Sequence, residues 1–199
     1  MLYAVICASN QNRSMEAHHA LAKRGYQVHS YGTNSMIKLP GMSADRPNSY
    51  PFGTATTYAS IQQDLIAKNR EYYTNSGLLS LLDRNKQIKA CPERFQDRLP
   101  PSSGGPDFDV IVTCEERCFD IVGEDLLGRQ VVAGKPVWVI NFDIKDTPED
   151  AAVGARLIVQ AVSQLEEAGG EDGVAKVLDD LQSTTNRANI PIMYTVHFT

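Results

Sequence analysis

The fold is decided near the start of the chain, in residues 2–14, LYAVICASNQNRS. Residues 2–6 form a nearly continuous apolar run, which is typical of a strand buried on both faces of a parallel sheet. A polar loop follows, and from Ser14 apolar residues recur at helical spacing until Gly25. Residues 26–31 then alternate with a period of two. The first 32 residues therefore predict a strand, a helix and a second, parallel strand.

The remaining chain continues this α/β pattern after an interruption. Residues 32–57 are rich in Gly, Pro, Asn and Ser, and they predict a long functional loop rather than a plain connector. With two helices expected at 58–73 and 77–85, we interpret residues 34–98 as an insert. Further strands are predicted at 108–113, 136–142 and 192–198, and further helices at 115–127 and 147–165. Residues 166–173 are expected to break this last helix, and another helix is expected to run to about residue 183. We expect one domain over residues 1–199, with a mainly parallel central sheet between two helical layers and a C-terminal strand.

Composition narrows the class of protein. The chain has 199 residues, 24 acidic against 19 basic side chains, and a net charge of −5. A chain with this charge lacks the overall positive field that attracts nucleic acid, so we expect no direct nucleic-acid partner. No apolar run approaches the length of a membrane-spanning helix, so no membrane role is expected. Four cysteines in a chain of this length indicate a reducing compartment rather than a disulfide framework.

The loop after the first strand has the residue types of a phosphate-ester nucleophile. A cysteine at the end of a buried strand, Cys7, precedes Arg13 by six residues, and Ser14 follows at a helix start. Arg13 can bind two phosphate oxygens, and the positive field stabilises a thiolate on Cys7. Ser14 is placed to donate a hydrogen bond to the sulfur. The loop backbone can form an anion cradle, whose residues are Ala8, Ser9, Asn10, Gln11 and Asn12. The alternative is that Cys7 is an inert core residue.

Such chemistry needs a general acid to protonate the leaving oxygen. Asp143 and Asp146 follow the strand predicted at 136–142, at the same edge of the sheet as Cys7. From spacing alone, either carboxyl group is a candidate, and at least one of them is expected to be only a turn or cap residue.

Other candidate sites are weaker. Cys114 and Cys118 would need two further ligands to hold zinc, and no second close pair exists, so we interpret them as ordinary helical cysteines and expect no metal and no cofactor. His18 and His19 are adjacent on a helix and are expected at the surface.

The chain resembles one eukaryotic family along nearly its whole length. The motifs that carry the resemblance are residues 7–18 (CASNQNRSMEAH), 30–33 (SYGT), 37–41 (IKLPG), 45–48 (DRPN), 82–85 (LDRN), 91–96 (CPERFQ), 113–117 (TCEER) and 141–143 (NFD). In this order they are similar to the RNA polymerase II C-terminal-domain phosphatase family of the messenger-RNA 3′-end cleavage and polyadenylation machinery.

The resemblance implies a low-molecular-weight tyrosine phosphatase-like fold and a protein serine/threonine phosphatase that works through a phosphocysteine. The implied substrate is phosphoserine at heptad position five of the polymerase tail, followed by a cis proline, with position seven as a further target. Matched motif by motif, Cys7 is the nucleophile, Arg13 the phosphate binder and Ser14 the partner of the sulfur. Asp146 aligns with the general acid, and Asp143 is expected to support its loop. Lys38, Leu39, Pro40 and Leu81 align with residues of the family's substrate groove. At the position of Leu81, members of the family have a methionine.

The family also implies partners. These are the phosphorylated C-terminal domain of RNA polymerase II and a symplekin-like helical-repeat scaffold, together with nuclear localisation. Two other functions remain open from the sequence: an arsenate reductase, which would pass oxidising equivalents to downstream cysteines, and a phosphopeptide-binding module without catalysis.

Overall fold

The computed structural model describes residues 1–43, 45–129, 134–168, 170–187 and 190–198. Its centre is a five-stranded sheet with the strand order β2-β1-β5-β6-β7. The first four of these strands in space are parallel, and β7 pairs antiparallel with β6. The strands are β1 (Leu2–Cys7), β2 (Gln27–Gly32), β5 (Val110–Thr113), β6 (Pro136–Phe142) and β7 (Ile192–Phe198).

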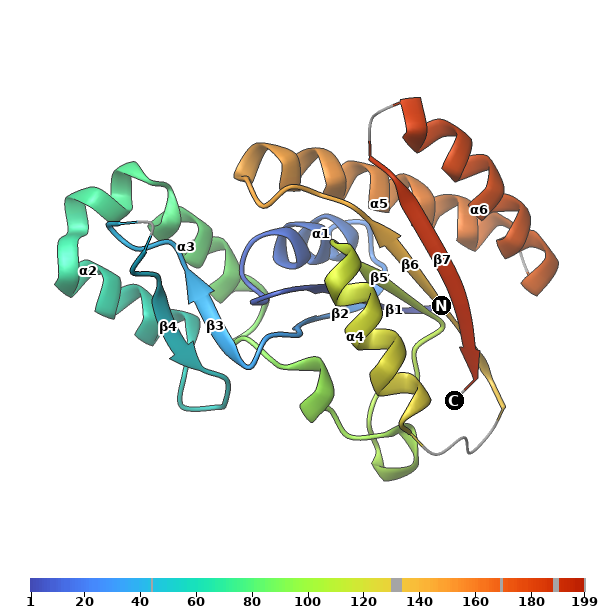
Figure 1. The fold of residues 1–199 in the computed structure, drawn as a ribbon, viewed down its shortest axis with the longest axis horizontal. Coiled ribbons are helices and arrows are strands. Elements are labelled where there is room, and N and C mark those ends of the chain that lie inside the picture. Colours follow the sequence, from blue (N-terminus) through green and yellow to red (C-terminus); the bar gives the residue numbers. More distant parts are fainter. Residues whose placement is uncertain (44, 130–133, 169, 188–189, 199) are drawn as a thin grey trace.

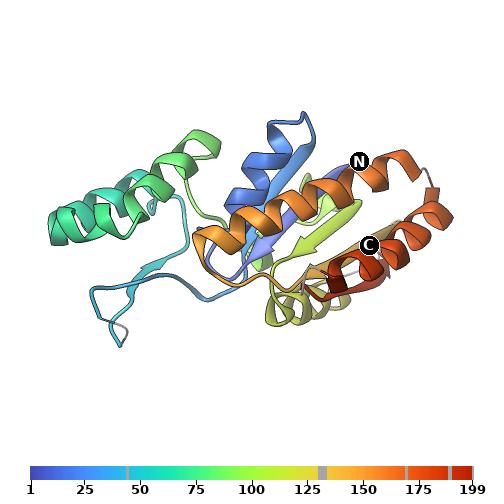
Figure 2. The ribbon, with the colours of Figure 1, turned by 90° about the horizontal axis from the view of Figure 1, so that it is seen from above.

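Helices cover both faces of this sheet (Figures 1 and 2). One face packs against α1 (Arg13–Ala22) and α5 (Pro148–Ala168), with α6 (Gly170–Arg187) beside α5 and β7. The opposite face packs against α4 (Glu116–Leu127). The prediction of a mainly parallel sheet between two helical layers is therefore confirmed. Among the helices of the described residues, none combines the length and apolar character needed to cross a membrane.

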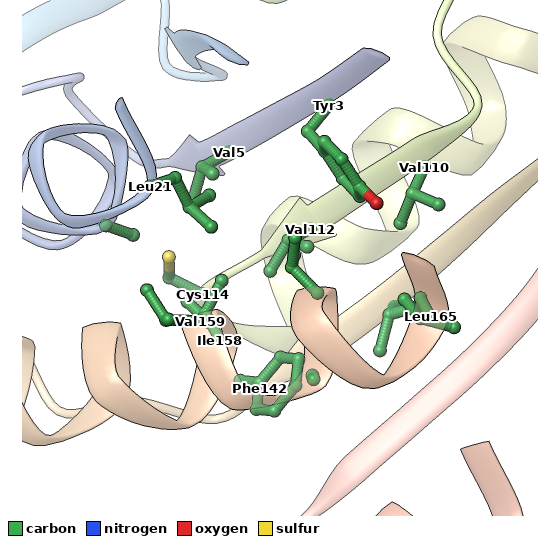
Figure 3. Packing of buried hydrophobic residues seen from close by; sticks show 14 of the residues in the cluster. Tyr3, Val5, Leu21, Val110, Val112, Cys114, Phe142, Ile158, Val159 and Leu165 are labelled. Atoms are coloured by element: carbon green, nitrogen blue, oxygen red, sulfur yellow. The ribbon is translucent and has the colours of Figure 1, made fainter. Parts of the chain in front are cut away.

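Two apolar cores hold the layers together. In the larger core, alternate side chains of β1 and β5, such as Val5 and Val112, meet the apolar stripe of α5, including Ile158 and Leu165 (Figure 3). Thr147 directly precedes α5 and caps its first turn, because its hydroxyl accepts a hydrogen bond from the amide of Asp150 at 3.0 Å. The parallel strands are thus fixed with their carboxyl ends at one edge, where the loops after β1, β5 and β6 meet.

The insert contains a hairpin that the sequence did not predict. Strands β3 (Met36–Leu39) and β4 (Asn48–Pro51) pair antiparallel, where a long loop was expected. Helices α2 (Tyr58–Asn75) and α3 (Leu78–Ile88) follow, with α3 ending three residues beyond its predicted end. Apolar side chains of the hairpin and both helices form a separate core, which Met15 of α1 joins. The insert projects from the carboxyl edge of the sheet, beside the loop after β1 (Figure 1).

Two side-chain predictions were wrong. His18 is half-buried rather than at the surface, because α1 turns it toward β2, where its Nδ1 lies 2.9 Å from Ser30 Oγ. Cys114 is not on a helix: it directly follows β5 and is fully buried in the larger core (Figure 3). Cys118 does lie on α4 and is also buried.

Candidate active site

The loop between β1 and α1 curls around the position of Cys7. Asn10 has a φ of +53°, in the left-handed region that few side chains adopt readily. Its side chain is held on both sides: Oδ1 accepts a hydrogen bond from the Glu93 amide at 3.1 Å, and Nδ2 donates to Ser14 Oγ at 3.2 Å. Gly32 lets β2 approach closely, since a Cβ there would lie 2.9 Å from the Ala8 carbonyl oxygen. A left-handed residue between ordinary ones turns successive amides toward one point, which is how anion-binding loops form.

The thiol of Cys7 has a hydroxyl partner. Its Sγ lies 3.0 Å from Ser14 Oγ, at the start of α1. Ser14 is fully buried, and Cys7 is nearly so, although it lines the pocket described below. The sulfur thus faces a hydrogen-bonding group from the N-terminus of a helix, where partial positive charge stabilises an anion.

Arg13 is buried and surrounded by acceptors from two loops, those after β5 and β6. Its Nη2 forms an ion pair with Glu115 Oε2 at 2.7 Å, and its Nε lies 3.4 Å from Asp146 Oδ1. Nη1 donates to the carbonyl oxygens of Ile144 at 2.9 Å and Cys114 at 3.2 Å. Burial disfavours the charged guanidinium, but the Cys7 sulfur, Asp146 and Glu115 outweigh it, so the pKa of Arg13 is raised above its ordinary value.

The two candidate acids differ in their surroundings. Asp146 points toward the cysteine loop: its Oδ1 accepts a hydrogen bond from Asn12 Nδ2 at 3.0 Å, and its side chain is 60% exposed. Asp143 is exposed, and its amide donates to the Pro191 carbonyl at 3.1 Å. Among the described residues, none hydrogen-bonds or ion-pairs with the Asp143 carboxylate. Of the two, Asp146 is the one that lies in the pocket beside Cys7.

A pocket of about 210 Å³ joins the cysteine loop to the insert. It brings together most of the predicted site residues, while Ala8, Asn10, Arg13, Ser14 and Asp143 are outside its lining. The lining residues are Cys7, Ser9, Gln11, Asn12, Lys38, Leu39, Pro40, Ser76, Leu78, Leu81, Asp146 and Pro148. The hairpin is fixed to the loop because Ser9 Oγ accepts a hydrogen bond from the Lys38 amide at 3.0 Å. The wall is apolar at Leu39, Pro40 and Leu81, while Lys38 supplies a cation.

Sequence reasoning assigned no role to several residues that contact this site. Glu115 binds Arg13, and Arg84 and Asn85 of α3 bind the carbonyl oxygen of Gln11. Tyr58, at the start of α2, donates to the carbonyl oxygen of Asn10. Glu115, Arg84 and Asn85 fall inside motifs that carried the family resemblance, residues 113–117 and 82–85. Their place in these motifs was the sequence signal that could have identified them.

The buried downstream cysteines have other partners. Cys118 Sγ lies 3.2 Å from Thr33 Oγ1, and burial raises the pKa of both the Cys114 and the Cys118 thiols. Within the described part of the chain, no group of three or more His, Cys, Asp or Glu side chains is placed to hold a metal ion. The chemistry that this arrangement supports is therefore a thiol nucleophile, an anion cradle with an arginine, and a nearby carboxyl group.

Comparison with known proteins gives the family. The model of the Ssu72-like protein family matches residues 1–199. A relative from Schizosaccharomyces pombe, the RNA polymerase II C-terminal domain phosphatase ssu72, is 46% identical over 98% of this chain and 95% of its own.

Solved structures agree with this match. A serine phosphatase of the RNA polymerase II C-terminal domain from Drosophila melanogaster has a TM-score of 0.88 and 43% identity, covering 100% of this chain and 99% of its own. D. melanogaster Ssu72, solved with Symplekin and a cis peptidomimetic of the polymerase tail phosphorylated at the serine of position five, has a TM-score of 0.87 and 40% identity, covering 100% and 98%. With the cysteine loop and pocket described above, these matches show that the chain belongs to the Ssu72-like protein family.

Proposed function

We propose that this chain is a cysteine-dependent phosphatase that removes phosphate from phosphoserine in the C-terminal domain of RNA polymerase II. The observation that carries the proposal is the pocket in which the Cys7 thiol and Asp146 open onto Lys38, Leu39 and the rest of the insert wall. The names of the S. pombe and D. melanogaster relatives support the same substrate.

In the first step, the Cys7 thiolate attacks the phosphorus. A sulfur–phosphorus bond forms as the bond from phosphorus to the serine oxygen breaks, and Asp146 gives its proton to that oxygen. The amides of residues 8–13 and the Arg13 guanidinium hold the phosphoryl oxygens, where charge develops. Ser14 stabilises the sulfur anion by its 3.0 Å contact.

In the second step, water replaces the sulfur. The Asp146 carboxylate takes a proton from the attacking water, a new phosphorus–oxygen bond forms, and the sulfur–phosphorus bond breaks. Phosphate leaves, the Cys7 thiolate is restored, and Asp146 is protonated for another cycle. One group serves as acid and then base, so the cycle needs no further proton donor.

The groove favours a short peptide with an apolar residue after the phosphoserine. Leu39, Pro40 and Leu81 offer an apolar surface next to Cys7. A proline in the cis form would fold the chain back against this surface, and the phosphorylated cis peptidomimetic bound to the D. melanogaster relative supports this interpretation. Heptad position five is the proposed target, and position seven stays a prediction.

The proposal extends to the cell. The Symplekin bound to the D. melanogaster relative supports a symplekin-like scaffold as a partner of this chain in messenger-RNA 3′-end processing. A polymerase substrate also requires the protein to act in the nucleus.

The test is phosphate release from heptad peptides phosphorylated singly at positions two, five and seven, with Cys7→Ser as the blank. Release from the position-five peptide that is lost in Cys7→Ser is the expected result. If Cys7→Ser kept every function of the wild type, a binding module would be indicated instead. Activity confined to thioredoxin-coupled arsenate reduction would indicate a reductase.

A further inference from the structure

Three side chains of the insert bind the backbone carbonyls of the cysteine loop; we call them the carbonyl clamp. Tyr58 Oη donates to the Asn10 oxygen at 2.7 Å. Asn85 Nδ2 donates to the Gln11 oxygen at 2.8 Å. Arg84 Nη2 donates to the Gln11 oxygen at 3.0 Å and reaches the Asn12 oxygen at 3.4 Å.

The clamp acts on the amides as well as on the carbonyls. In a trans peptide the C=O of one residue and the N–H of the next point in opposite directions within one plane. A carbonyl at residues 10, 11 or 12 that is held toward the insert therefore turns the N–H of residues 11, 12 or 13 the other way. Those amides belong to the predicted anion cradle, whose strength depends on donors that are aimed before the charge develops.

We propose that Tyr58, Arg84 and Asn85 are positioning residues that set the phosphate-binding amides of the cysteine loop. This inference rests on the proposed phosphatase function and adds to it the way in which the insert controls phosphate affinity. No clamp residue lines the pocket, so each acts through the loop backbone rather than by touching the substrate.

Arg84 is itself fixed from several sides. Its Nη1 forms an ion pair with Glu16 of α1, and its Nε and Nη2 donate to Asn85 Oδ1 at 3.1 and 2.9 Å. Asn85 is fully buried, and the Arg84 side chain is 18% exposed. A planar guanidinium can hold a carboxylate, an amide oxygen and a carbonyl at once, which a lysine ammonium cannot do with the same geometry.

The same helix also forms the substrate groove. Leu78 and Leu81 of α3 line the pocket, and Arg84 follows Leu81 by three residues, about one helical turn. The groove wall and the clamp therefore share one rigid element. A substitution in the clamp should weaken phosphate binding for every substrate, whereas Leu81→Ala should affect only peptides that use the groove.

The experiment measures the inhibition constant of orthovanadate, with an aryl phosphate as substrate, well below the unfolding temperature of each variant. Arg84→Met should raise this constant about tenfold to a hundredfold, because hydrogen bonds from a charged donor are lost. Tyr58→Phe, which removes one hydroxyl, should raise it about threefold to tenfold. Arg84→Lys should lie between Arg84→Met and the wild type.

Lys86→Met is the matched control. It also removes a cation from α3, but one that ion-pairs with Asp83 at 2.7 Å and donates to Gln62 rather than to the loop. It should leave the orthovanadate constant unchanged. A role limited to stability would lower the unfolding temperature of the clamp variants without moving their orthovanadate constants.

Two results separate this inference from the proposed function. Folded Tyr58→Phe and Arg84→Lys proteins that bind orthovanadate as tightly as the wild type would overturn the clamp, even if Arg84→Met does not fold. The phosphatase proposal would instead be overturned if the wild-type protein bound no orthovanadate. It would also be overturned if the Cys7→Ser protein bound orthovanadate as tightly as the wild type does.

Discussion

Glu115 Oε2 lies 2.7 Å from Nη2 of Arg13, which ties the loop after β5 to the arginine beside the candidate nucleophile. The pair is largely buried, since only 5% of the Arg13 side chain and 26% of the Glu115 side chain are exposed. A carboxylate in this position helps to fix the plane of the guanidinium, whose Nη1 donates to the carbonyl oxygens of Ile144 and Cys114.

We predict that Glu115→Gln lowers kcat/KM for phosphoserine peptides by about tenfold, because an amide holds the Arg13 guanidinium less firmly than a carboxylate does. Glu116→Gln, at the neighbouring exposed position, is the control and should retain wild-type activity. Steady-state kinetics on both variants checks this, and equal activity in the two would contradict the orienting role of Glu115.

Asp146 and Asp143 can be separated by the leaving group. A serine alkoxide must be protonated as it departs, whereas an activated aryl phosphate releases a stable phenolate. Asp146→Asn should therefore lose about 10² to 10⁴ in rate with a phosphoserine peptide and much less with the aryl ester. Asp143→Asn, if Asp143 supports the loop, should affect both substrates to a similar degree. A leaving-group-selective loss at Asp143 would reverse the two roles.

Thiol reactivity should distinguish Cys7, which lines the pocket, from Cys114 and Cys118, which do not. We expect iodoacetamide near neutral pH to alkylate Cys7, and phosphate or orthovanadate to protect it. Cys114 and Cys118 should resist, since burial raises the pKa of both thiols. Mass spectrometry of the labelled peptides over time gives the order in which the cysteines are alkylated, with Cys7→Ser as the reference. Labelling of Cys114 or Cys118 before Cys7 would argue against a reactive Cys7.

The isomer of the substrate proline should be visible in the kinetics. In unfolded peptides about 10 to 30% of such bonds are cis, and exchange takes tens of seconds or longer. With enzyme in excess, a proline-directed phosphoserine peptide should release phosphate in a fast phase followed by a slow phase, which a prolyl isomerase accelerates. A single phase that is insensitive to the isomerase would mean that the groove accepts the trans form.

His18 should make stability depend on pH. Burial, followed by the nearby Lys89, His29 and His19, lowers the pKa of His18 to about 4. Below pH 6.5 the unfolded chain binds a proton that the folded chain does not, so stability is complete above pH 6.5 and falls as the pH drops toward 4.

Between pH 7 and pH 5 we expect a loss of about 1 to 2 kcal/mol from His18, reduced from the full value because the ring is only half-buried. Urea unfolding at both pH values measures this difference in the free energy of unfolding. In His18→Gln the difference between the two pH values should shrink by that amount, and an unchanged difference would exclude His18 as its source.

Patterns within a few residues predicted much of the fold. Strands β6 (Pro136–Phe142) and β7 (Ile192–Phe198) begin and end where their apolar runs do. The hairpin was missed because β4 holds Asn48 and Pro51, which disfavour strands. It forms through tertiary contacts: Asn48 Nδ2 donates to the Pro40 oxygen at 2.9 Å and lies 3.0 Å from Tyr73 Oη.

In the candidate site, too, local sequence patterns predicted some residues, whereas contacts between distant parts of the chain were missed. Cys7, Arg13 and Ser14 lie within eight consecutive residues, at the two ends of one loop, so their spacing was enough to suggest their chemistry. Arg84 meets the Gln11 carbonyl across 73 residues, and Arg13 meets the Cys114 carbonyl across 101. No local period encodes such contacts, and they follow only from the packing of the insert and the order of the strands.

The left-handed backbone of Asn10 restricts which amino acids can occupy that position. Glycine would relieve the backbone but would remove the acceptor that the Glu93 amide uses and the donor that Ser14 uses. Aspartate would keep the acceptor and place a negative charge near a sulfur that must itself become an anion. Asparagine supplies backbone tolerance, a donor and an acceptor without charge, so the tightest chemical requirement in the loop falls on a residue that never touches the reacting phosphorus.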